Sequence, residues 1–110
     1  MILTTTDSVP GRVTAEILGL VEASSVVSPG LEKGISAAFS MLGGGKVSVF
    51  EDLLKQARTH ARSDLEAAAA ALHADAVLGF RYATSEVGQG VCEVIAYGTA
   101  VKLLKPGATL

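Results

Sequence analysis

The chain has 110 residues, of which 49% are hydrophobic, 18% charged and 5% aromatic, with a formal net charge of -2. This composition is typical of one globular domain, and area scaling gives about 5,700 Å² of accessible surface for a compact fold of this size. The near-neutral charge argues against nucleic acid as a partner, because that binding draws on clustered lysine and arginine.

Cysteine usage and the apolar runs indicate the compartment. Cys92 is the only cysteine, so the chain forms no intrachain disulfide, and a reducing environment fits best. Residues 1–7 lack the basic and apolar regions of a signal peptide. Apolar runs end well before the roughly 20 residues that a membrane span needs. We therefore expect a cytoplasmic protein with no membrane partner.

The N-terminal part of the chain predicts two strands. Residues 2–6 are short and β-branched, and residues 13–27 form a long run rich in valine, isoleucine and serine. Gly19 lies in the middle of the second strand, where glycine weakens a strand and marks a bulge, a bend or a close backbone approach.

Two helices are predicted next. Residues 31–42 carry apolar side chains at helical spacing and predict a short helix. Residues 48–72 predict the main helix, because apolar residues follow one stripe with charges opposite. Ser48 and Glu51 have the spacing of a capping box, which places the start of this helix at Ser48. The stripe comprises Phe50, Leu53, Leu54, Ala57, Ala61, Leu65, Ala68 and Leu72.

A β-hairpin is predicted at the end of the chain. Residues 76–87 and 91–104 are strand-like and are separated by Gly88, Gln89 and Gly90. The expected fold class is therefore α+β, with an antiparallel sheet, one long helix and one short helix.

The strands are apolar on both faces, which predicts association. In residues 91–104, Ile95 and Tyr97 alternate with Val94 and Ala96, and the long first strand shows the same pattern. One long helix covers only one face of such a sheet. We expect the other face to pack against further copies of the chain in a closed, symmetric homo-oligomer.

Six short stretches carry a resemblance to a known family. In order they are Leu3-Thr4-Thr5-Thr6, Leu18-Gly19-Leu20-Val21, Gly43-Gly44, Ala57-Arg58 with Ala61, Ala74-Asp75-Ala76-Val77-Leu78-Gly79 and Tyr97-Gly98-Thr99-Ala100-Val101. Together they resemble the YbjQ-like family of small, uncharacterised bacterial proteins. The resemblance implies a dodecin-like α+β subunit assembled as a ring, commonly a homopentamer. It implies one YbjQ-like domain over residues 1–105 and a C-terminal tail over residues 106–110.

The same family is often described as heavy-metal-binding, and three residues are candidates for such a site: Cys92, His73 and Asp75. His60 and His73 are about 20 Å apart along the helix, so they cannot share an ion within one chain. A site would have to form between subunits. The alternatives are that Cys92 is a small strand residue and that His73, which stands where the family usually has glycine, ends the helix in a left-handed conformation.

Two further features have open interpretations. The stretch Gly43-Gly44-Gly45-Lys46 precedes the main helix and is either a weak anion site or a turn. Arg58 either forms an ion pair within or between subunits or is a solvated charge. No cysteine–histidine pair is recognisable, so we expect a structural or binding protein that is not an enzyme, with no cofactor except an ion or small ligand held between subunits. The remaining alternative is an enzyme whose active site forms at the subunit interface.

Overall fold

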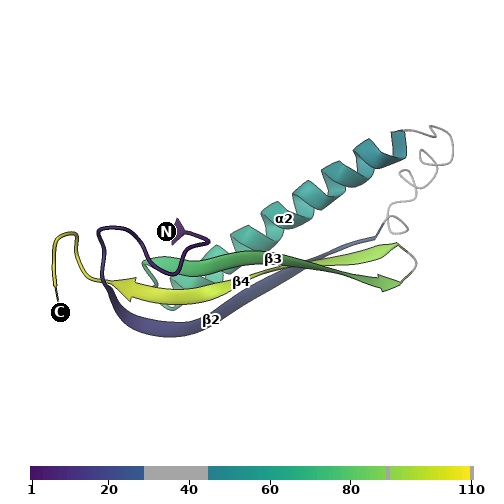
Figure 1. Ribbon diagram of the computed structural model, residues 1–110. Helices are drawn as coiled ribbons and strands as arrows, with labels where there is room; N and C mark the ends of the chain where they lie inside the picture. Colours follow the sequence, from purple (N-terminus) through teal and green to yellow (C-terminus); the bar gives the residue numbers. More distant parts are fainter. Residues whose placement is uncertain (29–44, 89, 110) are drawn as a thin grey trace.

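The computed structural model describes residues 1–28, 45–88 and 90–109. The elements follow the order β1 (Ile2–Leu3), β2 (Thr14–Val27), α2 (Gly45–Ala71), β3 (Ala76–Gly88) and β4 (Val91–Leu103). Figure 1 shows α2 lying along a sheet of long strands. This arrangement confirms the predicted α+β class. The short helix predicted over residues 31–42 lies outside the described residues.

The sheet has the strand order β1-β3-β4-β2. The hairpin of β3 and β4 and the pairing of β2 with β4 are antiparallel. However, β1 pairs parallel with β3, through Ile2 opposite Ala76 and Leu3 opposite Val77, so the prediction of a purely antiparallel sheet is wrong. Parallel pairing needs a long connection, and here β2 and α2 lie between the two strands in the chain.

Strand β1 is shorter than the predicted residues 2–6, because threonine hydroxyls turn the backbone. The Thr4 and Thr6 hydroxyls are 2.7 Å apart, and the Thr6 N–H donates to Thr4 Oγ1 over 3.2 Å. Such local bonds compete with a regular ladder. The segment still runs beside β3, since the Thr4 N–H donates to the Val77 carbonyl and the Phe80 N–H donates to the Thr4 carbonyl.

The predicted irregularity at Gly19 is a β-bulge. The register between β2 and β4 shifts between Ile17 and Gly19, and Gly19 has a φ of 131°. No atom lies within 4 Å of the position that a Cβ on Gly19 would take, so close packing is not the reason for the glycine. The left-handed backbone itself favours glycine here.

Helix α2 begins at Gly45, so the predicted start at Ser48 is wrong. A capping box sets a helix start only when the residues before it leave the helix, and Lys46 and Val47 are tolerated in helices. Gly45 and Lys46 are therefore helical residues, whereas Gly43 and Gly44 lie outside the described residues.

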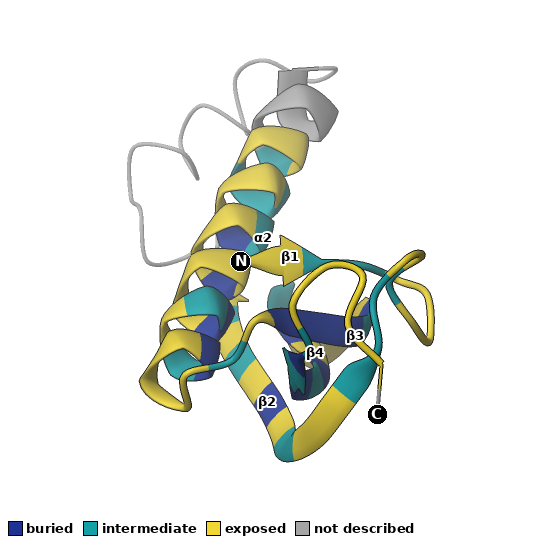
Figure 2. Cartoon of the chain, turned by 90° about the vertical axis from the view of Figure 1, so that its left-hand side faces the viewer, coloured by how far each residue is buried: buried dark blue, intermediate teal, exposed yellow. Residues whose placement is uncertain are grey.

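The apolar stripe of α2 packs on the sheet as predicted. Ala61 and Leu65 are fully buried, Ala57 is 4% exposed, and Leu53, Leu54 and Ala68 are half-buried. Figure 2 shows the buried residues on the side of α2 that faces the strands. Leu72 departs from the prediction, since it is 41% exposed beyond the end of the helix. The largest core cluster comprises Val21, Ala61, Leu65, Ala69, Val77, Phe80, Ala96 and Ala100.

The end of α2 is a Schellman motif with His73 in the left-handed position. His73 has a φ of 60°. Its N–H donates to the Ala70 carbonyl over 2.9 Å, and the Ala74 N–H donates to the Ala69 carbonyl over 3.1 Å. These are the two bonds that define the motif. The prediction that His73 ends the helix in a left-handed conformation is confirmed.

We expect the His73→Gly variant to be more stable than the natural chain, by about 1 kcal/mol, because glycine adopts a positive φ without the steric cost of a Cβ. Thermal unfolding followed by circular dichroism, at equal subunit concentration, measures the change. His73→Ala is the control, since it removes the imidazole but keeps the Cβ. An equal gain in both variants would show that the imidazole, and not the backbone, is the source of the strain.

Candidate functional site

The sheet face opposite α2, here called the open face, carries large exposed apolar side chains. Val21, Ala23 and Val27 of β2 pack on the helix side. Because side chains alternate along a strand, Leu20 and Val26 point the other way. Exposure is 71% for Ile17, 67% for Leu20, 57% for Val26 and 37% for Tyr97.

Among the described residues, those that cover the open face lie at its end nearest the chain termini. Leu78, Val101 and Leu103 form a small cluster there, with Val9 of the N-terminal segment packed against it. Further along the same face, Ile95 and two carboxylates, Glu22 and Glu93, line a shallow open hollow. The expectation that one long helix leaves an apolar sheet face uncovered is therefore confirmed for the single subunit.

The structure places Cys92 far from the other two predicted ligands. Cys92 is a free, half-buried thiol at the beginning of β4, opposite Val27 of β2 and Glu86 of β3. Asp75 contacts Leu103 at the other end of β4. Eleven residues of extended strand span about 36 Å, so these groups cannot share an ion within one subunit.

Asp75 has a structural explanation of its own. Its Oδ2 accepts a hydrogen bond of 2.8 Å from the Leu103 N–H. Its backbone N–H donates to the Val101 carbonyl over 2.9 Å, and its carbonyl accepts from the Ile2 N–H over 3.2 Å. Asp75 therefore fastens the end of β4 and the first residue of β1 to the start of β3.

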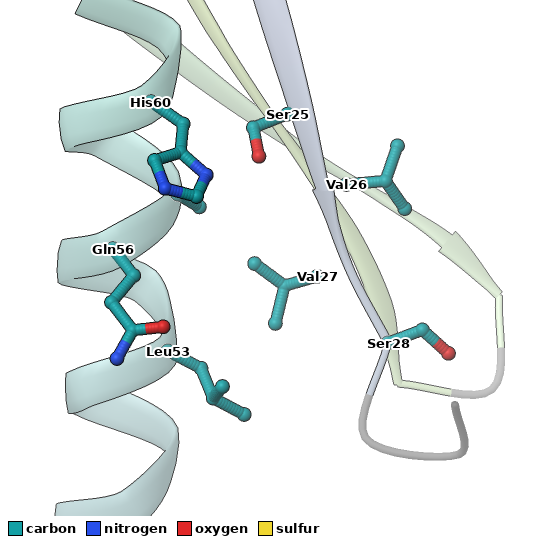
Figure 3. A pocket seen from close by; sticks show the side chains of 8 residues that line it. Ser25, Val26, Val27, Ser28, Leu53, Gln56 and His60 are labelled. Atoms are coloured by element: carbon teal, nitrogen blue, oxygen red, sulfur yellow. The ribbon is translucent and has the colours of Figure 1, made fainter. Parts of the chain in front are cut away.

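A pocket that the sequence did not predict lies between α2 and the end of β2. Figure 3 shows His60 and Gln56 projecting from the helix toward β2, while Val27 projects back toward Leu53. Both polar and apolar side chains line the pocket. His60 and Gln56 are one helical turn apart, which is the only sequence signal for it; the residues of β2 that complete it are remote in the chain. The lining residues are Ser25, Val26, Val27, Ser28, Leu53, Gln56, Ala57 and His60.

Comparison with known proteins decides the family. The family described as "Putative heavy-metal-binding" under the name YbjQ matches residues 1–104. The chain belongs to the YbjQ family. A UPF0145 protein of Thermotoga maritima is 47% identical over 105 residues, covering 96% of this chain and 99% of that one. A UPF0145 protein of Methanoculleus marisnigri is 42% identical over 104 residues, covering 94% and 97%.

A solved structure supports the YbjQ fold. The crystal structure of a protein of unknown function from Pediococcus pentosaceus matches with a TM-score of 0.59. It is 24% identical and covers 94% of this chain and 97% of that chain. The four-stranded sheet and single described helix are therefore shared with another member of this fold.

Among residues 1–28, 45–88 and 90–109, no group of three or more His, Cys, Asp or Glu side chains could hold an ion, so these residues do not form the metal centre that the description of the YbjQ family suggests. In the same ranges, no helix is long and apolar enough to cross a membrane.

We expect Asp75→Ala to destabilise the fold by about 1 kcal/mol, because the Leu103 N–H loses its acceptor. Asp75→Asn is the matched control, since it keeps an acceptor oxygen while removing the charge, and we expect it to retain most of the stability. Urea unfolding at equal subunit concentration separates the two variants. Equal losses in both would point to the charge of Asp75 and so to a role other than this hydrogen bond.

Proposed function

We propose that this YbjQ-family chain works as a homo-oligomer in which the open face of each sheet packs against a neighbouring subunit. The observation that carries the proposal is the exposure of Ile17 and Leu20, which are 71% and 67% exposed on one face of the sheet. Large contiguous apolar patches on a subunit mark interaction sites. A closed ring satisfies every such face at once, and the resemblance to the family favours a homopentamer.

The dimensions of the subunit support this proposal. The accessible surface is 6821 Å², about one fifth more than the roughly 5,700 Å² of a compact monomer of this mass. The radius of gyration is 18.0 Å, against about 13 Å for a compact chain of 110 residues. The subunit extends over 61 × 20 × 17 Å. A shape this elongated exposes surface that association can bury.

The role that we propose for the assembly is structural or ligand-binding. In the described part of the chain, the predicted site residues Cys92 and Asp75 lie at opposite ends of β4, and Asp75 is engaged in holding strands together. Within one subunit these two residues therefore form no shared site, and the proposal includes no catalytic step.

Native mass spectrometry of untagged protein, purified without chelator, tests the proposal. We expect one oligomer of defined subunit number, five under the ring hypothesis, at micromolar concentration. A monomer at that concentration would contradict it. The same spectrum reports the mass of anything that the assembly retains.

The alternative function is heavy-metal or small-ligand binding at a site between subunits. The description of the family and the half-buried free thiol of Cys92 favour it. Symmetry would supply further copies of Cys92, His73 or Asp75 around an axis, which a single subunit lacks. If Cys92 is a ligand, then Cys92→Ser lowers the metal content of the oligomer, measured by inductively coupled plasma mass spectrometry. Unchanged metal content would exclude the cysteine version of this site.

A further inference from the structure

A cationic groove lies on the helix side of the sheet, where α2 borders β3. Three cations of α2, Lys55, Arg58 and Arg62, line it together with Thr59 and with Tyr82 of β3. The cations follow steps of three and four residues, so they share one side of the helix. Helix α2 packs mainly on β2 and β4 and much less on β3, so the groove lies at the edge of the helix contact with the sheet.

Among the described residues, no carboxylate lines the groove, and none of the three cations forms an ion pair. Glu51 and Glu66 lie one helical turn beyond Lys55 and Arg62 on the same side of α2, but neither is a lining residue of the groove. The intrasubunit ion pair considered for Arg58 is therefore not formed in residues 1–28, 45–88 and 90–109. Lys55 and Arg62 each lie one helical turn from Arg58, and like charges at this spacing destabilise a helix. An anion in the groove would remove that repulsion.

The β3 wall of the groove is held by core packing. Tyr82 is half-buried, contacts two core clusters, and meets the ring of Phe80 edge-on at a centroid distance of 5.0 Å. The Thr59 hydroxyl donates to the Lys55 carbonyl over 3.0 Å, so its proton is already used. Arg58 is half-buried, whereas Lys55 and Arg62 are exposed. The donors that remain are therefore the two guanidinium groups, the Lys55 ammonium and the Tyr82 hydroxyl.

We propose that this groove binds a tetrahedral oxyanion, either inorganic phosphate or a phosphoryl group, or a metal carried as an oxyanion such as molybdate. Guanidinium groups present paired N–H donors that match the oxygens of such anions. A cationic groove repels a bare metal cation. The oxyanion form would reconcile the description of the family with a subunit that holds no described cluster of metal ligands. The groove lies on the opposite side of the sheet from the open face, so the inference is independent of the proposed assembly.

Isothermal titration calorimetry in a phosphate-free buffer tests the inference. Sodium phosphate and sodium molybdate are titrated separately into the oligomer as purified, with sodium chloride at matched ionic strength as the reference. We expect saturable binding of one anion per subunit. Arg58→Gln is expected to weaken it at least tenfold, since a charge-assisted hydrogen bond is lost. Lys105→Gln, which removes one exposed charge outside the groove, is expected to leave the affinity unchanged.

The outcomes separate the sources of the anion. Binding of phosphate alone supports a phosphoryl ligand, and preference for molybdate supports a metal oxyanion. Absence of saturable binding of either anion to the natural protein would overturn the inference, as would equal losses in Arg58→Gln and Lys105→Gln. If neither anion binds and Arg58→Gln changes the subunit number in native mass spectrometry, the cations pair with carboxylates of a neighbouring subunit and the groove is not a ligand site.

Discussion

The Leu20→Glu variant is expected to be a monomer at concentrations where the natural chain is assembled. Leu20 is 67% exposed in the middle of the open face, near Ile17 and Tyr97. Burying an unpaired carboxylate in an apolar interface costs several kcal/mol, whereas the leucine gains about 2 kcal/mol from burial. A loss of this size at every contact of a symmetric assembly prevents closure. Native mass spectrometry and light scattering after size exclusion measure the subunit number.

The matched control for this variant is Val87→Glu. Val87 is 68% exposed, nearly the same as Leu20, but it lies at the tip of the β3–β4 hairpin, next to Gly88. Both variants replace an exposed apolar strand residue by glutamate, and so they differ only in position. We expect Val87→Glu to assemble normally. If Leu20→Glu keeps the natural subunit number, the open face is not the interface. If both variants dissociate, the contact extends to the hairpin tip.

The sequence predicted those parts of the fold that depend on local patterns. The stripe through Ala57, Ala61 and Leu65 set the buried side of α2, and Gly19 and His73 marked two special backbone positions that the structure confirms. The parallel pairing of β1 with β3 was missed, because a two-residue strand carries no signal about its partner. The start of α2 was predicted wrongly at Ser48, because a capping motif can also occur inside a helix that continues further toward the N-terminus. The sequence alone does not decide between these two cases.

The candidate surfaces divide in the same way. Apolar residues on both faces of the strands predicted the open face, since alternation along a strand is a local property. The cationic groove was missed, although Arg58 had been singled out. Lys55, Arg58 and Arg62 share a helix side by spacing alone, but the wall that turns that side into a groove is Tyr82, which only the tertiary structure brings there. Asp75 was predicted as a metal ligand for the same reason: its hydrogen bond from the Leu103 N–H joins residues that are distant in the chain, so the sequence does not show it.

Gly98 belongs to one of the stretches that resemble the family, and it lies where a larger residue would collide with its neighbours. A Cβ on Gly98 would lie 2.5 Å from Val77 Cγ1 and 3.0 Å from the Leu78 carbonyl oxygen. Gly79, with a φ of 61°, interrupts the register of β3 here, and the backbone at Phe80 approaches β4. Val77 is fully buried, so its methyl group has no free space to enter.

We expect Gly98→Ala to destabilise the fold by about 1–3 kcal/mol, the usual cost of overpacking a core. Thermal unfolding at equal subunit concentration measures it, because the melting temperature of an oligomer depends on concentration. Thr84→Ala is the control, since it changes one exposed side chain of the sheet away from this close approach.

The double variant Gly98→Ala, Val77→Ala tests the cause of this loss. Val77→Ala alone creates a cavity and is itself destabilising. In the double variant, however, the new methyl group of residue 98 occupies space that the Val77 side chain has left. The double variant should therefore lose less stability than the sum of the losses in the two single variants, as is typical of residues in contact. Strict additivity would show that the clash with Val77 is not what requires glycine, and would leave the Leu78 carbonyl as the atom that fixes this position.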